Sequence, residues 1–314
     1  MIRFICAQPS ELYFAWQVEV MLNNFIEMGI DLNYVDIVCT KINNKIPEEW
    51  KKLSNEYDAR FFFYEDTRIT KHYISSIRPN IIKQHFKNNP NLKNETIFYH
   101  DCDIIFRVPI NWNQFENDDI FYGSNTNWYI SYDYIISKGK DIFDKMIEIV
   151  DINPQLVIDN NNNSIGAQYI LKNIDETFWE SVERDCENLF KKITKLNNKK
   201  KQENPSYHEL QIWTADMWSV LWNIWKCEYK TQCHPDLKFS WAKSNEDFYN
   251  QCNIMHNAGI LDSNINYFYK NKYINKLPYN LNLKIKENTA SKKYYEWVQK
   301  TEKKSILLKK NSLI

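Results

Sequence analysis

The sequence lacks several patterns that would identify a common class of protein at once. It has no GxGxxG run, which disfavours an NAD site, and no GxxxxGK[ST] run, which disfavours a P-loop phosphoryl transferase. Its seven cysteines are odd in number and contain no CxxC pair, so a disulfide framework is disfavoured and a reducing compartment is expected. The 40 basic and 40 acidic residues cancel, so the net charge gives no reason to expect nucleic-acid binding.

Long hydrophobic runs are also missing. Residues 1–16 contain too short an apolar run for a signal peptide, and they lack a small-residue cleavage site. Residues 213–225 are apolar, but this segment has only thirteen residues and includes Asp216. It is therefore too short and too charged to cross a bilayer. We therefore expect a soluble cytoplasmic protein without a transmembrane segment.

One set of residues has a spacing that faintly resembles a zinc site. It consists of Cys227, Cys233, Cys252 and His256. The gaps between these residues match neither a zinc ribbon nor a zinc finger, so a structural zinc is a minor alternative.

Charge is unevenly distributed along the chain. Residues 271–314 contain eleven Lys and three Glu, so they carry a charge of +8 and residues 1–270 carry −8. Such a basic segment suits an anionic partner or surface, but a solvated helical face is the simpler interpretation.

The first 106 residues alternate between strand-like and helix-like patterns. With 43% hydrophobic residues, the chain can also bury a sizeable core. This alternation predicts an α/β fold with a mostly parallel, Rossmann-like sheet flanked by helices, whose ligands bind beyond the carboxyl ends of the strands. The expected strands cover residues 2–8, 33–40, 59–66 and 95–106, and the expected helices cover 16–30, 47–57 and 80–88.

The second half is less regular, and we expect it to be rich in helices. Residues 118–125 and 128–137 resemble strands, whereas the Lys- and Asn-rich residues 194–207 predict an exposed loop. The expected domains are 1–270, made of a nucleotide-binding half (1–110) and an acceptor half (111–270), and a basic C-terminal extension (271–314).

Asp101 and Asp103 lie in an otherwise apolar run at the end of the fourth expected strand. Buried charges without partners are costly, so these carboxylates must be exposed, paired or bound to a cation. Alternating side chains would place both on one face about 7 Å apart, where they could share a divalent cation. A pair of carboxylates that caps the next segment is the alternative.

His256 is part of a second polar cluster, residues 255–260. Taken alone, it is more simply explained as a core or surface histidine. Imidazole together with carboxylates suits manganese better than magnesium, and Gly259 would permit a close approach of the backbone to a ligand.

These segments together resemble a metal-dependent, nucleotide-sugar glycosyltransferase of the GT-A type. The resemblance covers residues 2–262 and rests on "SSIRP", "FYHDCDIIF", "GAQYIL", "WTADMW" and "HNAGI". It implies that Asp101 and Asp103 hold Mn²⁺ or Mg²⁺ on a nucleoside diphosphate, with His256 as the third protein ligand. It also implies that the nucleoside lies in a cradle formed by the "CAQP" loop, which contains Ala7 and Gln8, and by the end of "FFFYED", near Tyr64.

A diphosphate leaving group needs further positive charge close to it. Arg78 begins an expected helix just before Pro79, so it is a candidate for this second cation, with a surface ion pair as the alternative.

The acceptor half offers a candidate base and candidate sugar contacts. Asp216 is the only acid among Trp and aliphatic residues, which would raise its pKa and suit a general base; a structural carboxylate is equally consistent. Residues 164–168 predict a tight turn that opens a helix, in which Gly166 admits a ligand and Gln168 bonds sugar hydroxyls, unless the glycine simply ends a loop. A sugar-stacking wall could be formed by Trp213, Trp218 and Trp222.

The leading hypothesis is a hexosyltransferase that moves a sugar from a nucleotide-sugar, most simply a UDP-sugar, to a hydroxyl acceptor. The candidate acceptors are a glycan, a protein and a modified nucleic acid. Inverting and retaining chemistry both remain open, since only inversion needs a base such as Asp216. The alternatives are a metal-dependent nucleotidyl or phosphoryl transferase and a non-catalytic module that binds sugar or nucleotide.

Overall fold

The computed structural model describes residues 2–262 and 266–311. Residue 1, residues 263–265 and residues 312–314 fall within the domains predicted from the sequence but lie outside this description.

The chain forms two compact units, and each is built from several stretches of sequence. Unit 1 comprises the residues up to Ala7 together with Tyr64–His100 and Trp112–Pro235, whereas unit 2 comprises Gln8–Phe63, Asp101–Asn111 and the residues from Asp236 onward. The domain boundaries that the sequence suggested remain a prediction.

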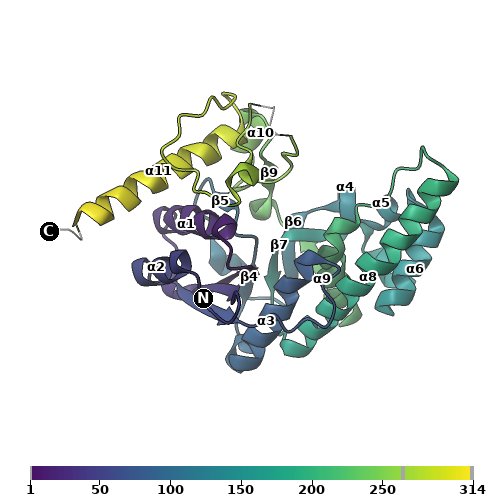
Figure 1. The fold of residues 1–314 in the computed structure, drawn as a ribbon. Helices are drawn as coiled ribbons and strands as arrows, with labels where there is room; N and C mark the ends of the chain where they lie inside the picture. Colours follow the sequence, from purple (N-terminus) through teal and green to yellow (C-terminus); the bar gives the residue numbers. More distant parts are fainter. Residues whose placement is uncertain (1, 263–265, 312–314) are drawn as a thin grey trace. The chain divides into compact units, whose positions relative to one another are not determined.

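Seven strands form a sheet in the order β3-β2-β1-β4-β7-β6-β8. Figure 1 labels three neighbouring strands of this sheet, β4, β7 and β6. In unit 1, β1 runs parallel to β4 and β6 runs parallel to β8, whereas β7 is antiparallel to β4 and β6. The mostly parallel α/β fold predicted from the sequence is confirmed. The strands are β1 (Arg3–Gln8), β2 (Val35–Thr40), β3 (Arg60–Tyr64), β4 (Ile97–Tyr99), β6 (Phe121–Asn125), β7 (Ile165–Leu171) and β8 (Thr231–Cys233).

Helix α8 (Glu176–Glu203) organises the helical layer of unit 1, where it packs against α3, α6 and α9. Asp175 caps its N-terminus, because the Asp175 carboxylate accepts a hydrogen bond from the backbone N–H of Thr177 at 3.0 Å. The exposed loop predicted at residues 194–207 is wrong for its first part, because Lys and Asn residues continue α8 through Glu203. The other helices are α3 (Ile77–Asn88), α4 (Asn127–Ile130), α5 (Tyr132–Ile136), α6 (Lys140–Val150), α7 (Pro154–Asp159) and α9 (Ala215–Lys226).

The second strand expected in this half, residues 128–137, is instead the pair of short helices α4 and α5. Ser131 separates them, and its hydroxyl accepts a hydrogen bond from the backbone N–H of Tyr134 at 3.2 Å. The aromatic and β-branched residues of this stretch suggested a strand. Three of them, Tyr129, Ile130 and Ile135, are buried, but their backbone is helical.

Unit 2 contains a second sheet of three short strands in the order β5-β10-β9. Strand β10 is antiparallel to β5 and parallel to β9. The elements of this unit, besides β2 and most of β3, are α1 (Leu12–Glu27), α2 (Glu48–Glu56), β5 (Ile104–Phe106), β9 (Phe239–Trp241), α10 (Glu246–Asn250), β10 (Ile254–His256) and α11 (Ala290–Asn311).

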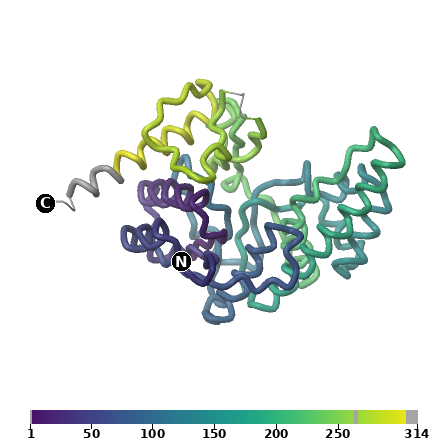
Figure 2. The backbone as a smooth tube through the Cα atoms, viewed as in Figure 1, coloured from purple at the N-terminus to yellow at the C-terminus, as the bar shows by residue number. Residues whose placement is uncertain are grey.

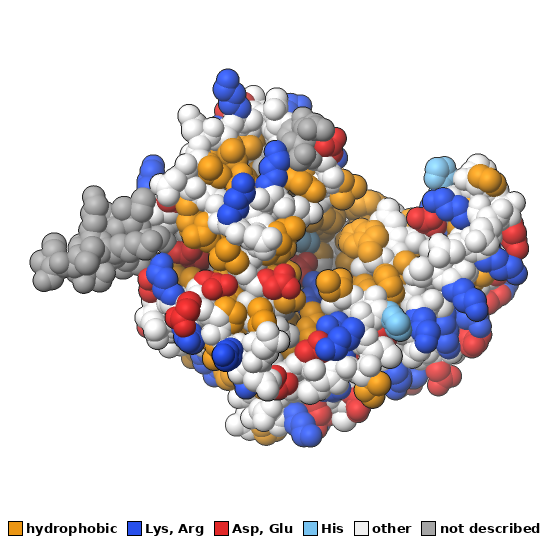
Figure 3. Space-filling model, in the orientation of Figure 1, with side chains coloured by type: hydrophobic (Ala, Val, Ile, Leu, Met, Phe, Trp, Pro, Cys, Tyr) orange, Lys and Arg blue, Asp and Glu red, His pale blue; other side chains and the backbone are white. Residues whose placement is uncertain are grey.

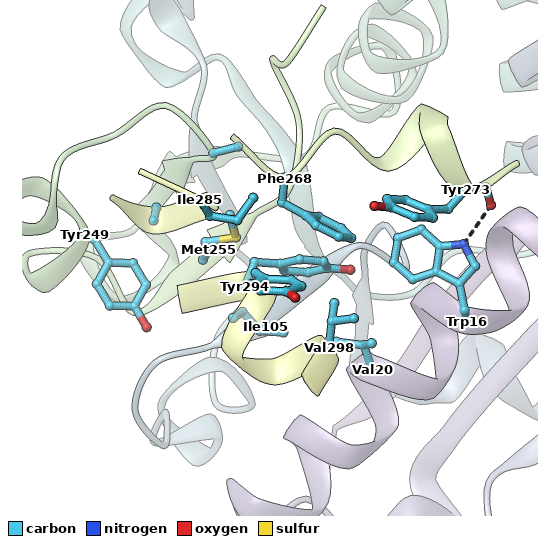
Figure 4. Packing of buried hydrophobic residues seen from close by; sticks show 13 residues of the cluster. Trp16, Val20, Ile105, Tyr249, Met255, Phe268, Tyr273, Ile285, Tyr294 and Val298 are labelled. Atoms are coloured by element: carbon cyan, nitrogen blue, oxygen red, sulfur yellow. Dashed lines mark hydrogen bonds between the residues drawn. The ribbon is translucent and has the colours of Figure 1, made fainter. Parts of the chain in front are cut away.

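The hydrophobic core of unit 2 joins its first and last segments (Figure 4). Phe268 lies against the rings of Trp16, Tyr273 and Tyr294, and the indole N–H of Trp16 donates to the carbonyl of Tyr273 at 3.1 Å. Figure 2 shows the same relation in the trace, in which α11 (yellow) lies beside α1 (purple). Within residues 271–304 of the basic C-terminal segment, one face therefore belongs to the core and the opposite face is solvated.

Several lysines near the C-terminus pair with acids of the same unit. Lys293 bonds Glu246 at 3.0 Å, and both Lys300 and Lys304 lie against Glu27 of α1. Unit 1 has the same mixture of charges. Figure 3 shows basic and acidic side chains together over α6 and α8, where Lys200 bonds Asp141 at 2.6 Å.

Among the described residues, no helix combines the length and the apolar character that crossing a membrane requires.

Phe268→Ala should lower the free energy of unfolding by about 3–5 kcal/mol, because it leaves a cavity among the aromatic rings of unit 2. The matched control is Leu261→Ala, in the same unit but 87% exposed, which should change it by less than about 0.5 kcal/mol. Urea titration followed by tryptophan fluorescence measures both. Equal effects of the two substitutions would contradict the assignment of Phe268 to the core.

Candidate functional site

The two candidate metal ligands Asp101 and Asp103 lie in a turn and not on a strand. Strand β4 ends at Tyr99 and β5 begins at Ile104, so the single strand predicted for residues 95–106 is interrupted between them. The argument from alternating strand side chains is therefore wrong, although both carboxylates still converge on one point.

Pairing of β5 with β10 brings His256 to this turn. In the antiparallel register His256 is opposite Ile104, and Ile104 directly follows Asp103 in the sequence. The backbone N–H of Asn257 donates to the carbonyl of Asp103 at 2.9 Å, which fixes the turn against the end of β10. Residues separated by more than 150 positions are thus joined by backbone pairing.

The potential ligand atoms of Asp101, Asp103 and His256 all lie within 4.8 Å of one another. The Nε2 atom of His256 is 3.4 Å from Asp101 Oδ2 and 3.2 Å from Asp103 Oδ1. Two carboxylates and one imidazole form a donor set that suits Mn²⁺, so the residues fit the predicted metal.

The imidazole of His256 is held in place by packing. It stacks on Trp241 of β9 with ring centroids 5.4 Å apart and an interplanar angle of 23°. Its Nδ1 atom is buried and has no hydrogen-bond partner among the described residues, whereas Nε2 faces the carboxylates. This orientation leaves Nε2 as the atom that would bind a cation.

Of the alternatives that the sequence left open for Asp103, exposure is wrong, because the residue is almost fully buried, with 4% of its surface exposed. Burial raises the pKa of a carboxyl group, yet the charges of Lys270 and His256 outweigh this effect and hold the pKa of Asp103 well below its ordinary value. Burial likewise lowers the pKa of His256, but Asp103 and Asp101 raise it further, so the net shift is upward. The opposite charges of Asp103 and of its neighbours His256 and Lys270 therefore stabilise one another.

Lys270 is a member of this site that the sequence analysis missed. Its ammonium forms an ion pair with Oδ2 of Asp103. Burial lowers the pKa of Lys270, but Asp103 more than compensates and raises it above the ordinary value. Lys270 lies fourteen residues after His256 in a stretch rich in Tyr, Asn and Lys, where no spacing distinguishes it from its neighbours.

The minor zinc alternative receives no support. Within residues 2–262 and 266–311, the metal-capable group consists of two aspartates and His256, and it includes no cysteine. Cys227 and Cys233 belong to unit 1, whereas Cys252 and His256 belong to unit 2.

The residues predicted to hold the nucleoside already have contacts of their own. Ala7 is buried in β1, and the side-chain amide of Gln8 donates to the carbonyl of Val38 at 3.2 Å. The hydroxyl of Tyr64 bonds Nδ1 of His85 at 3.0 Å. A nucleoside-binding role for Ala7, Gln8 and Tyr64 stays a prediction.

Arg78 and Asp216, predicted to act separately, form an ion pair with each other in unit 1. The second oxygen of Asp216 accepts a hydrogen bond from the hydroxyl of Tyr73 at 2.5 Å. The sequence suggested purely apolar surroundings for Asp216. This is wrong, because the guanidinium of Arg78 and the hydroxyl of Tyr73 both bond its carboxylate. The contacts of Arg78 match the alternative of an ion pair.

The tight turn predicted at residues 164–168 is wrong, because Gly166 and Gln168 lie in strand β7. A Cβ atom at position 166 would be 2.6 Å from the terminal methyl of Met217, so the glycine allows close packing. Gln168 is fully buried, and its Oε1 accepts from the hydroxyl of Ser124 at 2.6 Å. Within the described part of the chain, its Nε2 has no partner.

The tryptophan wall is only partly available to a ligand. Trp218 and Trp222 are completely buried, and the indole N–H of Trp218 donates to the carbonyl of Ile130 at 2.9 Å. These two rings belong to the core of unit 1, so stacking on a sugar is wrong for them. Trp213 is 60% exposed, and Trp128, which the sequence analysis did not select, is also largely exposed.

No protein-family model matches the sequence, and no curated protein matches it. Solved structures that resemble the chain include the apo form of WbbM, a bifunctional glycosyltransferase, with a TM-score of 0.47 and 10% identity. That match covers 82% of this chain and 46% of WbbM, so this chain spans about half the length of WbbM.

Two further structures are of LgtC. The galactosyltransferase LgtC, in complex with donor and acceptor sugar analogues, has a TM-score of 0.41 and 8% identity, and the match covers 95% of each chain. An active-site mutant of LgtC has a TM-score of 0.41 and 9% identity, with 87% of this chain and 93% of that chain covered. Glycosyltransferases are thus among the solved structures that resemble this chain.

Arg78→Met should lower the free energy of unfolding by about 2 kcal/mol, since it leaves the buried carboxylate of Asp216 without its cation. Asp216→Asn in the same protein should recover part of this loss, because the neutral amide needs no counter-charge. A double-mutant cycle by urea unfolding should give a coupling energy of about 1–3 kcal/mol. Additive effects of the two substitutions would show that the ion pair does not stabilise unit 1.

Proposed function

We propose that this protein is a glycosyltransferase that moves a sugar from a nucleotide-sugar donor, most simply a UDP-sugar, to a hydroxyl group. The observation that carries the proposal is the convergence of Asp101, Asp103 and His256, with ligand atoms within 4.8 Å of one another. The motif resemblance found in the sequence supports the class of reaction, and the convergence of these three side chains supports a divalent cation at this point.

The charges of the site support an anionic ligand. His256 and Lys270 already face Asp103, and a divalent cation would add further positive charge at this point. When bound, Mn²⁺ or Mg²⁺ would neutralise the negative charge that develops on a diphosphate leaving group. A nucleoside diphosphate matches this charge, whereas a neutral sugar alone does not.

The protein's own side chains would hold this arrangement rigid. Asp103 is fixed by the backbone N–H of Asn257 and by the ammonium of Lys270. Trp241 fixes the plane of the His256 ring, so Nε2 points at the carboxylates before a ligand arrives. Asp101 is the most exposed of the three ligands, and we propose that it adjusts to the ligand.

On the acceptor side, we propose that Asp216 and Trp213 contribute to binding a hydroxyl-bearing acceptor. Asp216 is neutralised by Arg78 and bonded to Tyr73, so positioning a hydroxyl suits it better than accepting a proton. Trp213 offers an exposed ring for stacking on a sugar.

Nucleotide-sugars should raise the melting temperature of the protein only when Mn²⁺ or Mg²⁺ is present, because the metal and the diphosphate bind together. A screen of UDP-linked and other nucleotide-sugars by thermal shift, with and without metal, identifies the donor. Slow release of free sugar from that donor then separates a transferase from a binding module. Stabilisation without any sugar release would favour the binding module, and release of pyrophosphate would favour a nucleotidyl transferase.

Asp101→Asn should weaken Mn²⁺ binding by about tenfold or more while leaving the melting temperature unchanged without metal, since the side chain is partly exposed and the amide is nearly isosteric. The matched control is Asp247→Asn, an exposed acid of helix α10 in the same unit. Isothermal titration with Mn²⁺ measures both. Unchanged Mn²⁺ affinity in Asp101→Asn would remove this residue from the metal site.

A further inference from the structure

Lys270 is held at the metal site by a rigid backbone. Two of the next three residues are tied to helix α1, because Tyr13 Oη donates to Asn271 Oδ1 at 3.0 Å and Trp16 Nε1 donates to the carbonyl of Tyr273 at 3.1 Å. On the other side, the backbone N–H of Phe268 donates to Ser291 Oγ at 2.7 Å. Only the side chain of Lys270 is therefore free to rearrange when a ligand arrives.

The ammonium of Lys270 occupies part of the metal-binding set. It bonds Asp103 Oδ2, whereas His256 Nε2 lies 3.2 Å from the other oxygen, Oδ1. A divalent cation that binds Asp103 would thus meet a positive charge fixed to the same carboxylate. Two positive charges that bind the same carboxylate repel each other strongly when that carboxylate is as buried as Asp103.

We propose that Lys270 is a built-in competitor of the divalent cation, and that it makes metal binding depend on an anionic ligand. The proposal rests on the proposed function, which supplies a nucleoside diphosphate as that anion. Without the anion, Lys270 satisfies Asp103 and weakens metal binding. With the anion, both cations have a counter-charge, so the metal and the diphosphate each strengthen binding of the other.

A role of Lys270 in supporting the metal ligands predicts the opposite change in metal affinity. If Lys270 only supported the ligands, as outer partners of metal sites usually do, its removal would weaken metal binding. The sign of the change therefore distinguishes competition from support.

The test is Lys270→Met in the full chain, titrated with Mn²⁺ alone while free Mn²⁺ is measured by electron paramagnetic resonance. The variant should bind Mn²⁺ about tenfold more tightly than the wild type. Lys270→Arg, which keeps the charge, and Lys272→Met, an exposed lysine two positions away, should both resemble the wild type. Equal or weaker Mn²⁺ binding by Lys270→Met would overturn the proposal.

A second measurement tests the dependence on the anion, with UDP as the probe. UDP should strengthen Mn²⁺ binding about tenfold more in the wild type than in Lys270→Met, once binding of Mn²⁺ to free UDP is subtracted. An equal gain in both proteins would overturn this part. If the Lys270→Met results hold but no nucleotide-sugar is hydrolysed or transferred, the proposed function fails and the competition remains.

Folding of the variant is checked separately. Lys270→Met should melt below the wild type without metal, because Asp103 then lacks its ammonium partner, and excess Mn²⁺ should restore more stability to the variant than to the wild type. Lys270→Gln, which keeps a hydrogen-bond donor, provides a second variant if Lys270→Met does not fold. Its Mn²⁺ affinity must also exceed that of the wild type.

Discussion

The need to compensate the buried charge of Asp103 determines the arrangement of the whole site. This carboxylate lies in a turn where solvent cannot stabilise it, so it requires cations from the protein itself. His256 and Lys270 supply them from segments that follow it by more than 150 residues. The small sheet of β5, β9 and β10, which orients His256, and the aromatic core, which holds the backbone around Lys270, both serve this requirement.

The two groups of candidate residues differ in how their charges are balanced. Arg78 and Asp216 in unit 1 neutralise each other one to one, which makes a closed pair with a further bond to Tyr73. In unit 2, Asp103 faces both His256 and Lys270, and Asp101 lies 3.4 Å from the same imidazole nitrogen. The potential ligand atoms of Asp101, Asp103 and His256 converge within 4.8 Å, which marks this group as a place for an external cation and the first group as a structural or positioning element.

Sequence patterns predicted the α/β alternation and the two aspartates because strand and helix periodicity is local. They also selected His256, but through a motif resemblance and not through any local rule. Lys270 could not be found, since its role depends on long-range packing of Phe268 and Tyr273 around Trp16. Trp218 was misjudged for a related reason: an aromatic residue in a short apolar run has the same pattern whether its ring is buried or exposed.

Because unit 2 is discontinuous, its assembly during synthesis must follow a particular order. Residues 112–235 of unit 1 are contiguous and are made before Asp236, so they are available to fold first. Helix α1 and the aspartates, although made earlier, lack His256, Lys270 and the core residues of α11 until the ribosome has passed Val298. Helix α2 and strand β5 can pack against α1 early, but the part of α1 that contacts Phe268, Tyr273 and α11 stays uncovered through most of translation.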